Sequence, residues 1–155
     1  MWEIDAEVLA RLVAAERMVV LTGAGLSVAS GLGTFRGAGG LWNTVRVEDY
    51  ATPEAFARRP AAVWDWYAER WRGMRAAEPN AGHRTIVELE RWFPSCVVVT
   101  QNIDGLHQKA GSKTVLELHG GLRWARCARC GDRRRMDDAI AVTVSPPPCP
   151  CGGSF

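Results

Sequence analysis

The sequence has little of several features that would narrow its function at once. No apolar run approaches the length of a membrane span, and the net charge of +2 is too small to indicate a nucleic-acid partner by itself. The N-terminal residues, MWEIDAEVLARLV, are acidic and amphipathic, whereas a signal peptide begins basic and continues apolar. With 155 residues and 47% hydrophobic content, the chain is expected to be one soluble, globular, cytoplasmic domain.

A glycine-rich stretch follows the first apolar run. Residues 19–21, a β-branched and leucine run, break at Gly23 and Gly25, as a buried strand does where it enters a tight turn. Glycine lets the backbone approach an anion, and N–H groups at the start of a following helix can bind phosphate. Val28 stands where the dinucleotide fingerprint has its third glycine, so a nucleotide site and an ordinary strand-to-helix turn both stay open. Five further glycines and the lone cation Arg36 favour a loop that a ligand orders.

Helix starts are marked by capping residues. Asp5 is expected to cap a first helix that ends near Glu16, and Thr52 a short helix over residues 53–58 that has proline at its first position. A longer helix starts at Pro60, and Asn80 caps the next one. The apolar positions expected to face inward are Val8, Leu9, Leu12 and Val13 in the first helix, Val63, Trp64, Tyr67, Trp71 and Met74 in the Pro60 helix, and Ile86, Val87, Leu89 and Trp92 in the Asn80 helix.

Two further strands complete the pattern. Residues 96–100, CVVVT, are an uninterrupted apolar run of the kind buried on both faces of a parallel sheet, and residues 114–118 are a third candidate. Strands separated by helices favour an α/β fold, here a partial Rossmann-like parallel sheet flanked by helices. Ligands of such sheets bind at the carboxyl ends of the strands. The segments from Thr22 to Arg36 and from Gln101 to Asp104, together with His119, should therefore converge.

Polar side chains follow the second and third strands. Gln101, Asn102 and Asp104 offer two amides and a carboxylate that can recognise amide and ribose hydroxyl groups, although for this segment alone an Asx-rich turn with Asp104 and Gly105 at its corner is the favoured explanation. His119 follows a strand and precedes two glycines, a position where histidine can act as a general base. The other two histidines, at 83 and 107, lie in helical or turn contexts without evident partners and receive no chemical role.

Four of the five cysteines form two close pairs. Cys127-x-x-Cys130 is followed after 18 residues by Cys149-x-Cys151, and glycine follows each pair, as in a zinc ribbon with four thiolate ligands. Such a site is structural, because no position is left for water; the alternative is four reduced free thiols. Cys96 lies in an apolar strand and is interpreted as a small core residue.

These motifs together resemble the sirtuins, NAD-dependent protein-lysine deacylases. The resemblance rests on residues 23–27 (GAGLS), 34–37 (TFRG), 101–104 (QNID), 119–120 (HG) and the four cysteines, in this order. It implies a Rossmann-like domain with a smaller zinc-binding module, and a reaction that converts NAD and acyl-lysine to nicotinamide, free lysine and O-acyl-ADP-ribose. The implied cofactors are NAD and zinc, and the implied partners are acylated lysine side chains of proteins; neither a membrane nor a nucleic acid is expected.

The resemblance also assigns residue roles. Gln101 and Asn102 are expected at the nicotinamide ribose, Asp104 at the carboxamide, and His119 as the general base, with Asn102 also counted among the catalytic residues. The cofactor-binding set that it implies is Gly23, Ala24, Gly25, Ser27, Thr34, Phe35, Arg36, Trp42, Gln101, Asn102, Ile103 and Asp104.

A second layer of resemblance concerns the acyl group. Tyr67 and Arg70 lie three residues apart on one helix face and look like the pair with which the class III sirtuins, the desuccinylase and demalonylase branch, hold an acidic acyl group. Ala51 and Thr34 also match that branch, and a small residue at 51 leaves room for a longer acyl chain. The alternative is that Tyr67 is a core residue and Arg70 a solvated charge.

The chain departs from the family pattern in three places. Gly33 stands where a larger residue is common, and the second cysteine pair is tighter than usual. Family members continue past the equivalent of Phe155 with strands that complete the adenosine side of the NAD site, so we expect a C-terminally incomplete domain with weak or absent turnover alone. Within it, residues 1–122 are the Rossmann-like part with inserted helices at about 45–80, and residues 123–155 the zinc-binding module.

Two other functions stay open at this point. Six arginines crowd the ribbon, a pattern that also occurs in zinc-ribbon nucleic-acid-binding proteins, although Asp132, Asp137 and Asp138 interrupt the positive charge. The other alternative is an NAD-binding protein that transfers ADP-ribose.

Overall fold

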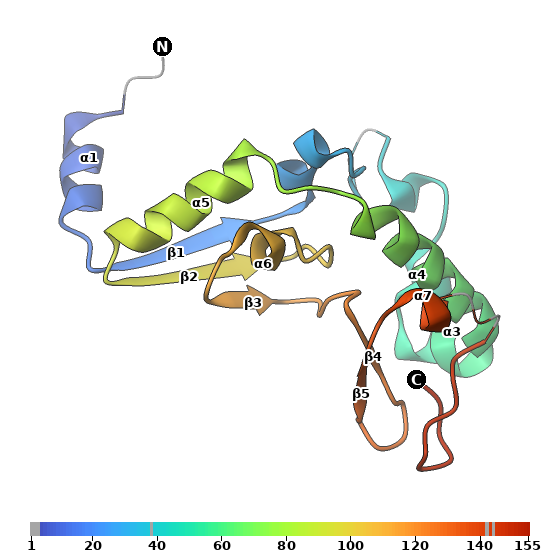
Figure 1. Cartoon of the computed structure of the whole chain (residues 1–155). Coiled ribbons are helices and arrows are strands. Elements are labelled where there is room, and N and C mark those ends of the chain that lie inside the picture. The colour runs from blue at the N-terminus through green and yellow to red at the C-terminus, as the bar shows by residue number, and fades with distance from the viewer. Residues whose placement is uncertain (1–3, 38, 142, 144) are drawn as a thin grey trace.

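The computed structural model describes residues 4–37, 39–141, 143 and 145–155, without the side chains of residues 42 and 138. A run of helices separates the first two strands, and shorter segments separate the later ones (Figure 1). In chain order they are α1 (Ala6–Val13), β1 (Arg17–Thr22), the 3₁₀ helices η1 (Ala24–Ser30) and η2 (Leu41–Asn43), α2 (Val47–Tyr50), α3 (Pro53–Arg58), α4 (Pro60–Arg75), α5 (Ala81–Trp92), β2 (Ser95–Thr100), α6 (Leu106–Ala110), β3 (Val115–Glu117), β4 (Trp124–Arg126), β5 (Arg133–Arg135) and α7 (Asp138–Ala141).

A three-stranded parallel sheet forms the first part of the molecule. The strand order is β1-β2-β3, with β1 paired to β2 from Arg17↔Ser95 to Thr22↔Thr100, and β2 to β3 from Val98↔Val115 to Thr100↔Glu117. Thr22, Thr100 and Glu117 therefore lie side by side at one edge. This parallel sheet with its helices confirms the expected α/β class, and it places the ends of all three strands together.

Helices cover one face of the sheet. In Figure 1, α5 and α6 lie against β1 and β2, and between them Ile86, Val98 and Leu106 are buried. The other face is open: Val19 is 67% exposed, Leu21 is 66% exposed, and Leu116 is exposed beside them. The expectation that β2 is buried on both faces is therefore wrong for the described residues, because only alternate residues of this strand face a helix.

The expected helix starts are confirmed by cap hydrogen bonds. The carboxylate of Asp5 accepts from the N–H groups of Glu7 and Val8, and the Thr52 hydroxyl accepts from Ala55 N–H at 3.1 Å. Asn80 and His83 form a capping box at the start of α5, with the Asn80 carbonyl oxygen accepting from backbone N–H groups. Such caps satisfy donors that a helix start leaves without partners.

The inward positions expected for α1 are wrong, and so is that of Trp92 in α5, whereas Ile86 of α5 is buried as expected. None of the residues of α1 is buried, so its apolar stripe is exposed, and Trp92 in the last turn of α5 is 82% exposed. Both misjudged segments lie at the margin of the described sheet, where helical periodicity has nothing to pack against. The described residues include no helix that is both long and apolar enough to cross a membrane.

The C-terminal residues form a separate small core. The two-stranded antiparallel sheet β4-β5 pairs Trp124 with Arg135 and Arg126 with Arg133. Trp64 of α4 enters this core, and its indole N–H donates to Thr143 Oγ1 at 3.0 Å. The buried cluster consists of Trp64, Ala125, Cys127, Ile140, Cys149 and Phe155. Helix α4 is thereby fixed to the cysteine-containing module while its other faces remain available to the rest of the chain.

Candidate functional site

The carboxyl edge of the parallel sheet carries a hydrogen-bonded group of polar residues. Thr22 Oγ1 donates to Thr100 Oγ1 at 2.8 Å, and Gln101 N–H donates to the Thr22 carbonyl at 3.0 Å. The third strand joins through Leu118 N–H, which donates to the Thr100 carbonyl at 2.9 Å. The three segments that the sequence marks as informative therefore do meet at one edge.

Asn102 and Asp104 are tied to the glycine loop through Ser27. The Asn102 amide donates to the Gly23 carbonyl at 3.0 Å and to Ser27 Oγ at 3.2 Å, and the Ser27 hydroxyl donates to Asp104 Oδ2 at 2.7 Å. Leu106 N–H donates to the other carboxylate oxygen, Oδ1, at 2.9 Å. Ser27 and Asn102 are buried, so both side chains are held in one orientation. Oδ1 of Asp104 thus accepts the hydrogen bond of an Asx turn, while Oδ2 connects Asp104 to the glycine loop through Ser27.

The glycine loop takes the form of a 3₁₀ helix rather than a fingerprint helix. Gly23 is extended, η1 follows over Ala24–Ser30, and Gly31 ends it in the left-handed region at φ 83°. Val28, at the position of the absent third glycine, is exposed, so no close helix-to-sheet contact requires glycine there. Farther along, a Cβ atom at Gly40 would lie 2.7 Å from the backbone of Arg36, and only glycine permits this fold of the loop.

A cavity of about 440 Å³ separates this loop from α4. The loop contributes residues 31–35 with Gly39 and Leu41, and α4 contributes Glu69, Arg70, Gly73 and Met74. Thr34 and Phe35 therefore face the same space as Arg70. Ala24 and Ile103 are half-buried, whereas Gly25, Arg36 and Gln101 are exposed; the Trp42 side chain lies outside the described residues.

Tyr67 and Arg70 are held by the ring of Trp66. The guanidinium of Arg70 lies 3.4 Å from the Trp66 ring centroid and donates to the Trp66 carbonyl at 2.8 Å, and the Tyr67 ring meets Trp66 edge-on at 4.8 Å. Burial raises the pKa of Tyr67 and lowers that of Arg70. Only 19% of the Arg70 side chain is exposed and its buried Nε has no partner in the described part of the chain, so Arg70 is not a solvated charge. Ala51 is exposed and follows Tyr50, whose ring stacks on Trp66.

His119 lies in the turn after β3, directly beyond the polar edge, and its side chain is exposed. A histidine in this position can exchange protons with a ligand and with solvent. The following residue, Gly120, has φ 71°, a left-handed conformation that turns the chain away from the sheet.

Two buried histidines beneath this edge were missed by the sequence interpretation. Nε2 of His107 lies 2.8 Å from Thr22 Oγ1, and Nδ1 of His83 accepts from Asn80 N–H at 3.3 Å. Their rings are 5.0 Å apart, and both side chains are buried. The Asn80 bond puts the proton of neutral His83 on Nε2, and donation by Thr22 to Thr100 puts that of His107 on its Nε2. A signal was present, since Asn80 and His83 have capping-box spacing.

The four paired cysteines form a cluster that fits a zinc ion. Their sulfur atoms all lie within 4.8 Å of one another, and the Cys127–Cys151 and Cys130–Cys149 sulfurs are 3.6 and 3.7 Å apart. Tetrahedral zinc with Zn–S bonds of about 2.3 Å places its sulfurs about 3.8 Å apart. Backbone N–H donors, from Cys130 and then from Arg129, lower the pKa of Cys127 to about 6. At Cys130 and Cys149 the backbone donors are outweighed by burial and the neighbouring sulfurs, which raise the pKa of both thiols, so a bound cation is needed to keep all four sulfurs as thiolates. Cys96 lies apart, half-buried in β2.

Removing one ligand of this cluster is expected to abolish zinc binding. Cys130→Ser should reduce bound metal from about one ion per chain to nearly none, because an alcohol is a poor ligand for zinc, and the module should unfold with it. Bound zinc is measured by atomic absorption after desalting, with Cys96→Ser as the matched control that retains the metal. Equal zinc content in both variants would show that the cluster does not bind it.

The buried histidine pair predicts a loss of stability in mild acid. Burial lowers the pKa of both His83 and His107 below the unfolded value of 6.5, and Asp104 offsets only part of this. The unfolded chain therefore binds protons that the folded chain does not, so stability is complete above pH 6.5 and falls below it, by up to about 1.4 kcal/mol per pH unit for each histidine.

Urea unfolding at pH 7.5 and 5.5 measures this effect. His107→Gln should reduce the difference between the two pH values, while the matched control His119→Gln, at an exposed position, should keep it. Zinc ligands also take up protons in this range, and they contribute equally to both variants. If the two variants depend on pH alike, His107 is not the source of the loss.

Comparison with known proteins agrees with the site geometry. The Sir2 family profile matches residues 23–154. The NAD-dependent protein deacylase of Aquifex aeolicus is 48% identical over 137 residues, 88% of this chain and 57% of the relative. The protein of the same name from Thermus thermophilus is 52% identical over 147 residues, 92% of this chain and 57% of the relative. The chain thus spans a little over half the length of these relatives.

Solved structures give the same result. A mutant Sir2 homologue in complex with ADP-ribose superposes with a TM-score of 0.89 at 41% identity, covering 98% of this chain and 61% of that one. A Sir2 homologue in complex with NAD gives a TM-score of 0.85 at 42% identity, covering 98% of this chain and 59% of the other. Sequence motifs, fold and cysteine cluster all coincide, and the chain belongs to the Sir2 family.

Proposed function

We propose that this protein is an NAD-dependent protein-lysine deacylase. The observation that carries the proposal is the buried hydrogen-bonded set of Asn102, Ser27 and Asp104, which joins the glycine loop to the strand ends beside exposed His119. The relatives from Aquifex aeolicus and Thermus thermophilus are named for this activity. Because the chain spans 57% of their length, the activity is proposed for the protein as a whole.

The residues present fit a dinucleotide at this edge. A carboxylate and an amide are preoriented, and the loop lines the cavity with three glycines beside Leu32, Phe35 and Leu41, so a ligand meets open backbone next to apolar side chains. We infer that the loop residues with Phe35 and Arg36 hold NAD and that Gln101 and Asn102 bind its ribose. Asp104, with Ile103 beside it, would hold the carboxamide. NAD, when bound, supplies the ADP-ribosyl group that accepts the acyl group.

The proton chemistry is assigned to His119. Its exposed imidazole at the end of β3 can take a proton from a ribose hydroxyl, so that this oxygen becomes nucleophilic. Asn102 is fixed by Gly23 and Ser27 and keeps its amide orientation throughout. The reaction would release free lysine, nicotinamide and O-acyl-ADP-ribose.

We further propose a preference for succinyl- and malonyl-lysine. Arg70 is desolvated, faces the cavity opposite Thr34 and Phe35, and retains a buried Nε without a partner in the described part of the chain. Guanidinium binds carboxylate through charge-assisted bonds, and burial strengthens them. Tyr67, with its raised pKa, stays protonated and can donate a further hydrogen bond. Exposed Ala51 follows Tyr50, whose ring stacks on Trp66, and its small side chain would leave room for a longer acyl chain.

The division of the chain follows the two sheets. We propose a Rossmann-like part over residues 1–122, with inserted helices at about 45–80, and a zinc-binding module over 123–155, since β1-β2-β3 and β4-β5 are separate sheets. The arginines of that module are largely engaged within the chain: Arg123 with Glu117, Arg129 with the Cys151 carbonyl, and Arg133 over Trp124. These contacts favour a structural role for that charge over nucleic-acid binding.

Loss of the proposed base separates the two halves of the reaction. His119→Ala in the protein expressed from its complete reading frame should lower deacylation at least about a hundredfold, because general-base catalysis supplies about 10²–10⁴-fold, while nicotinamide exchange is spared. Deacylation is followed with an acyl-lysine peptide, and O-acyl-ADP-ribose is identified by mass spectrometry. Near-normal deacylation would refute the assignment of His119, and transfer of ADP-ribose to protein without that product would refute the deacylase.

The acyl preference rests on Arg70. Arg70→Met should lower kcat/KM for a succinylated peptide about tenfold to a hundredfold, since hydrogen bonds to charged groups contribute about 1.5–3 kcal/mol, and should change deacetylation by less than about threefold. The acetylated peptide controls for folding, and Arg58→Met, at an exposed position of α3, controls for charge. Equal losses with both peptides would exclude a carboxylate-binding role.

A further inference from the structure

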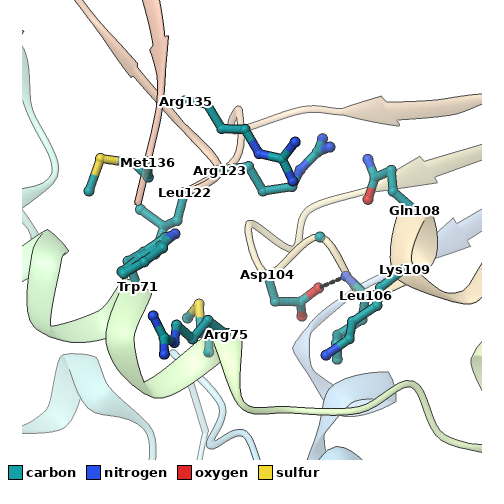
Figure 2. Close-up of a pocket in the computed structure, with 12 residues that line it drawn as sticks. Trp71, Arg75, Asp104, Leu106, Gln108, Lys109, Leu122, Arg123, Arg135 and Met136 are labelled. Carbon is teal, nitrogen blue, oxygen red and sulfur yellow. Dashed lines mark hydrogen bonds between the residues drawn. The ribbon is translucent and has the colours of Figure 1, made fainter. Parts of the chain in front are cut away.

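A second pocket lies between α4, the turn that follows β2, and the strand β5. Its volume is about 380 Å³, and it is distinct from the cavity between the glycine loop and α4, although Met74 contributes to both. Figure 2 shows its side chains converging from these three elements around the Asp104 turn. Residues 104–106 line it, and Asp104 is the residue that it shares with the proposed NAD site, so the pocket adjoins that site.

The pocket carries an excess of positive charge. Four cations line it, Arg75, Lys109, Arg123 and Arg135, against the single carboxylate of Asp104. Lys109 is paired with Glu78 at 2.7 Å and Arg123 with Glu117 at 2.9 Å. In the described part of the chain the Arg135 guanidinium has no hydrogen bond or ion pair, and the Nε of Arg123 is buried without a partner. The unpaired guanidinium of Arg135, beside the Arg123 Nε, therefore favours an anion from outside.

One wall of the pocket is apolar. Trp71, Leu122 and Met136 group together on the side of α4 and β5, as Figure 2 shows, and Arg75 lies over the Trp71 ring at 5.5 Å. Arg123 lies against the turn: a Cβ atom at Gly105 would be 2.7 Å from its Cδ, so this side chain is held in place by the backbone. An apolar wall opposite fixed cations is the usual composition of a site for small organic anions.

We propose that this pocket binds an organic monoanion, a carboxylate with an aromatic or aliphatic body. The carboxylate lies at Arg135 and Arg123, because the planar guanidinium fork matches a carboxylate in bidentate geometry. The body packs against Trp71, Leu122 and Met136. The site takes a free small molecule and is separate from Arg70, which the proposed function assigns to the acyl group of the substrate.

Methyl NMR of the zinc-loaded chain tests this site directly. Methionine methyl groups are labelled with ¹³C, and 3-phenylpropionate is titrated as the probe, with 3-phenylpropionamide as its neutral match. Met136 and Met74 should shift and saturate with the acid, while Met18 in β1, which does not line the pocket, should not. The amide should bind at least about tenfold more weakly, because it cannot replace the carboxylate.

Matched variants identify the cation. Arg135→Gln should weaken binding of the acid about tenfold and leave that of the amide unchanged; Arg133→Gln, on the same exposed strand but outside the pocket, should change neither. Arg70→Met should also leave the Met136 shifts unchanged, so the outcome is independent of the proposed function. The proposal is overturned by the absence of saturable shifts at Met136, by equal binding of acid and amide, or by equal effects of the two strand variants.

Discussion

The hydrogen bonds of Ser27 connect the two halves of the candidate site. Ser27 lies in a helix that follows β1, and its hydroxyl accepts from Asn102 and donates to Asp104, both of which follow β2. A serine hydroxyl has one proton, so its donation to Asp104 leaves its lone pairs for the amide, and the orientation of all three side chains is determined together. The parallel register that aligns Thr22 with Thr100 brings these segments within reach. The register of the sheet therefore determines where the glycine loop lies and how the polar side chains of the site are oriented.

The long helix α4 serves three surfaces at once. Near its start Trp64 joins the cysteine module, in its middle Arg70 faces the glycine-loop cavity, and Trp71 one residue later faces the second pocket. With 100° between successive residues, a single helix can present these side chains to three neighbours. The buried surface of α4 is accordingly broader than the apolar positions expected from the sequence. Trp66, which is not one of those positions, is buried beneath Arg70 and Tyr50.

The sequence predicted the features that depend on residues close together in the chain, namely helix starts and the cysteine cluster. Thr52 and Pro53 define the start of α3, Asn80 defines the start of α5, and the cysteine spacing defines the cluster. The motifs also indicated which segments meet. What could not be read is burial that depends on distant partners: Trp92 shares the periodicity of Ile86 but reaches no described neighbour, and His83 contacts His107, which lies 24 residues farther along the chain. The helical period predicts which residues share one face of a helix, whereas the tertiary structure determines what packs against that face.

The cysteine cluster begins eight residues after His119, and packing couples it to the helix α4 as well. Cys127 and Cys149 are buried in the same cluster as Trp64, so the ligands of the zinc site and the start of α4 share one core. The far turns of that helix carry Arg70, and α7 is attached to it by Arg72, which donates to the Ala141 carbonyl. A short module with three-residue strands cannot bury enough apolar area to be stable by itself. Metal binding is therefore expected to contribute the stability that holds α4, and with it Arg70, at the edge of the glycine-loop cavity, so a structural zinc site would bear on the acyl preference proposed for Arg70.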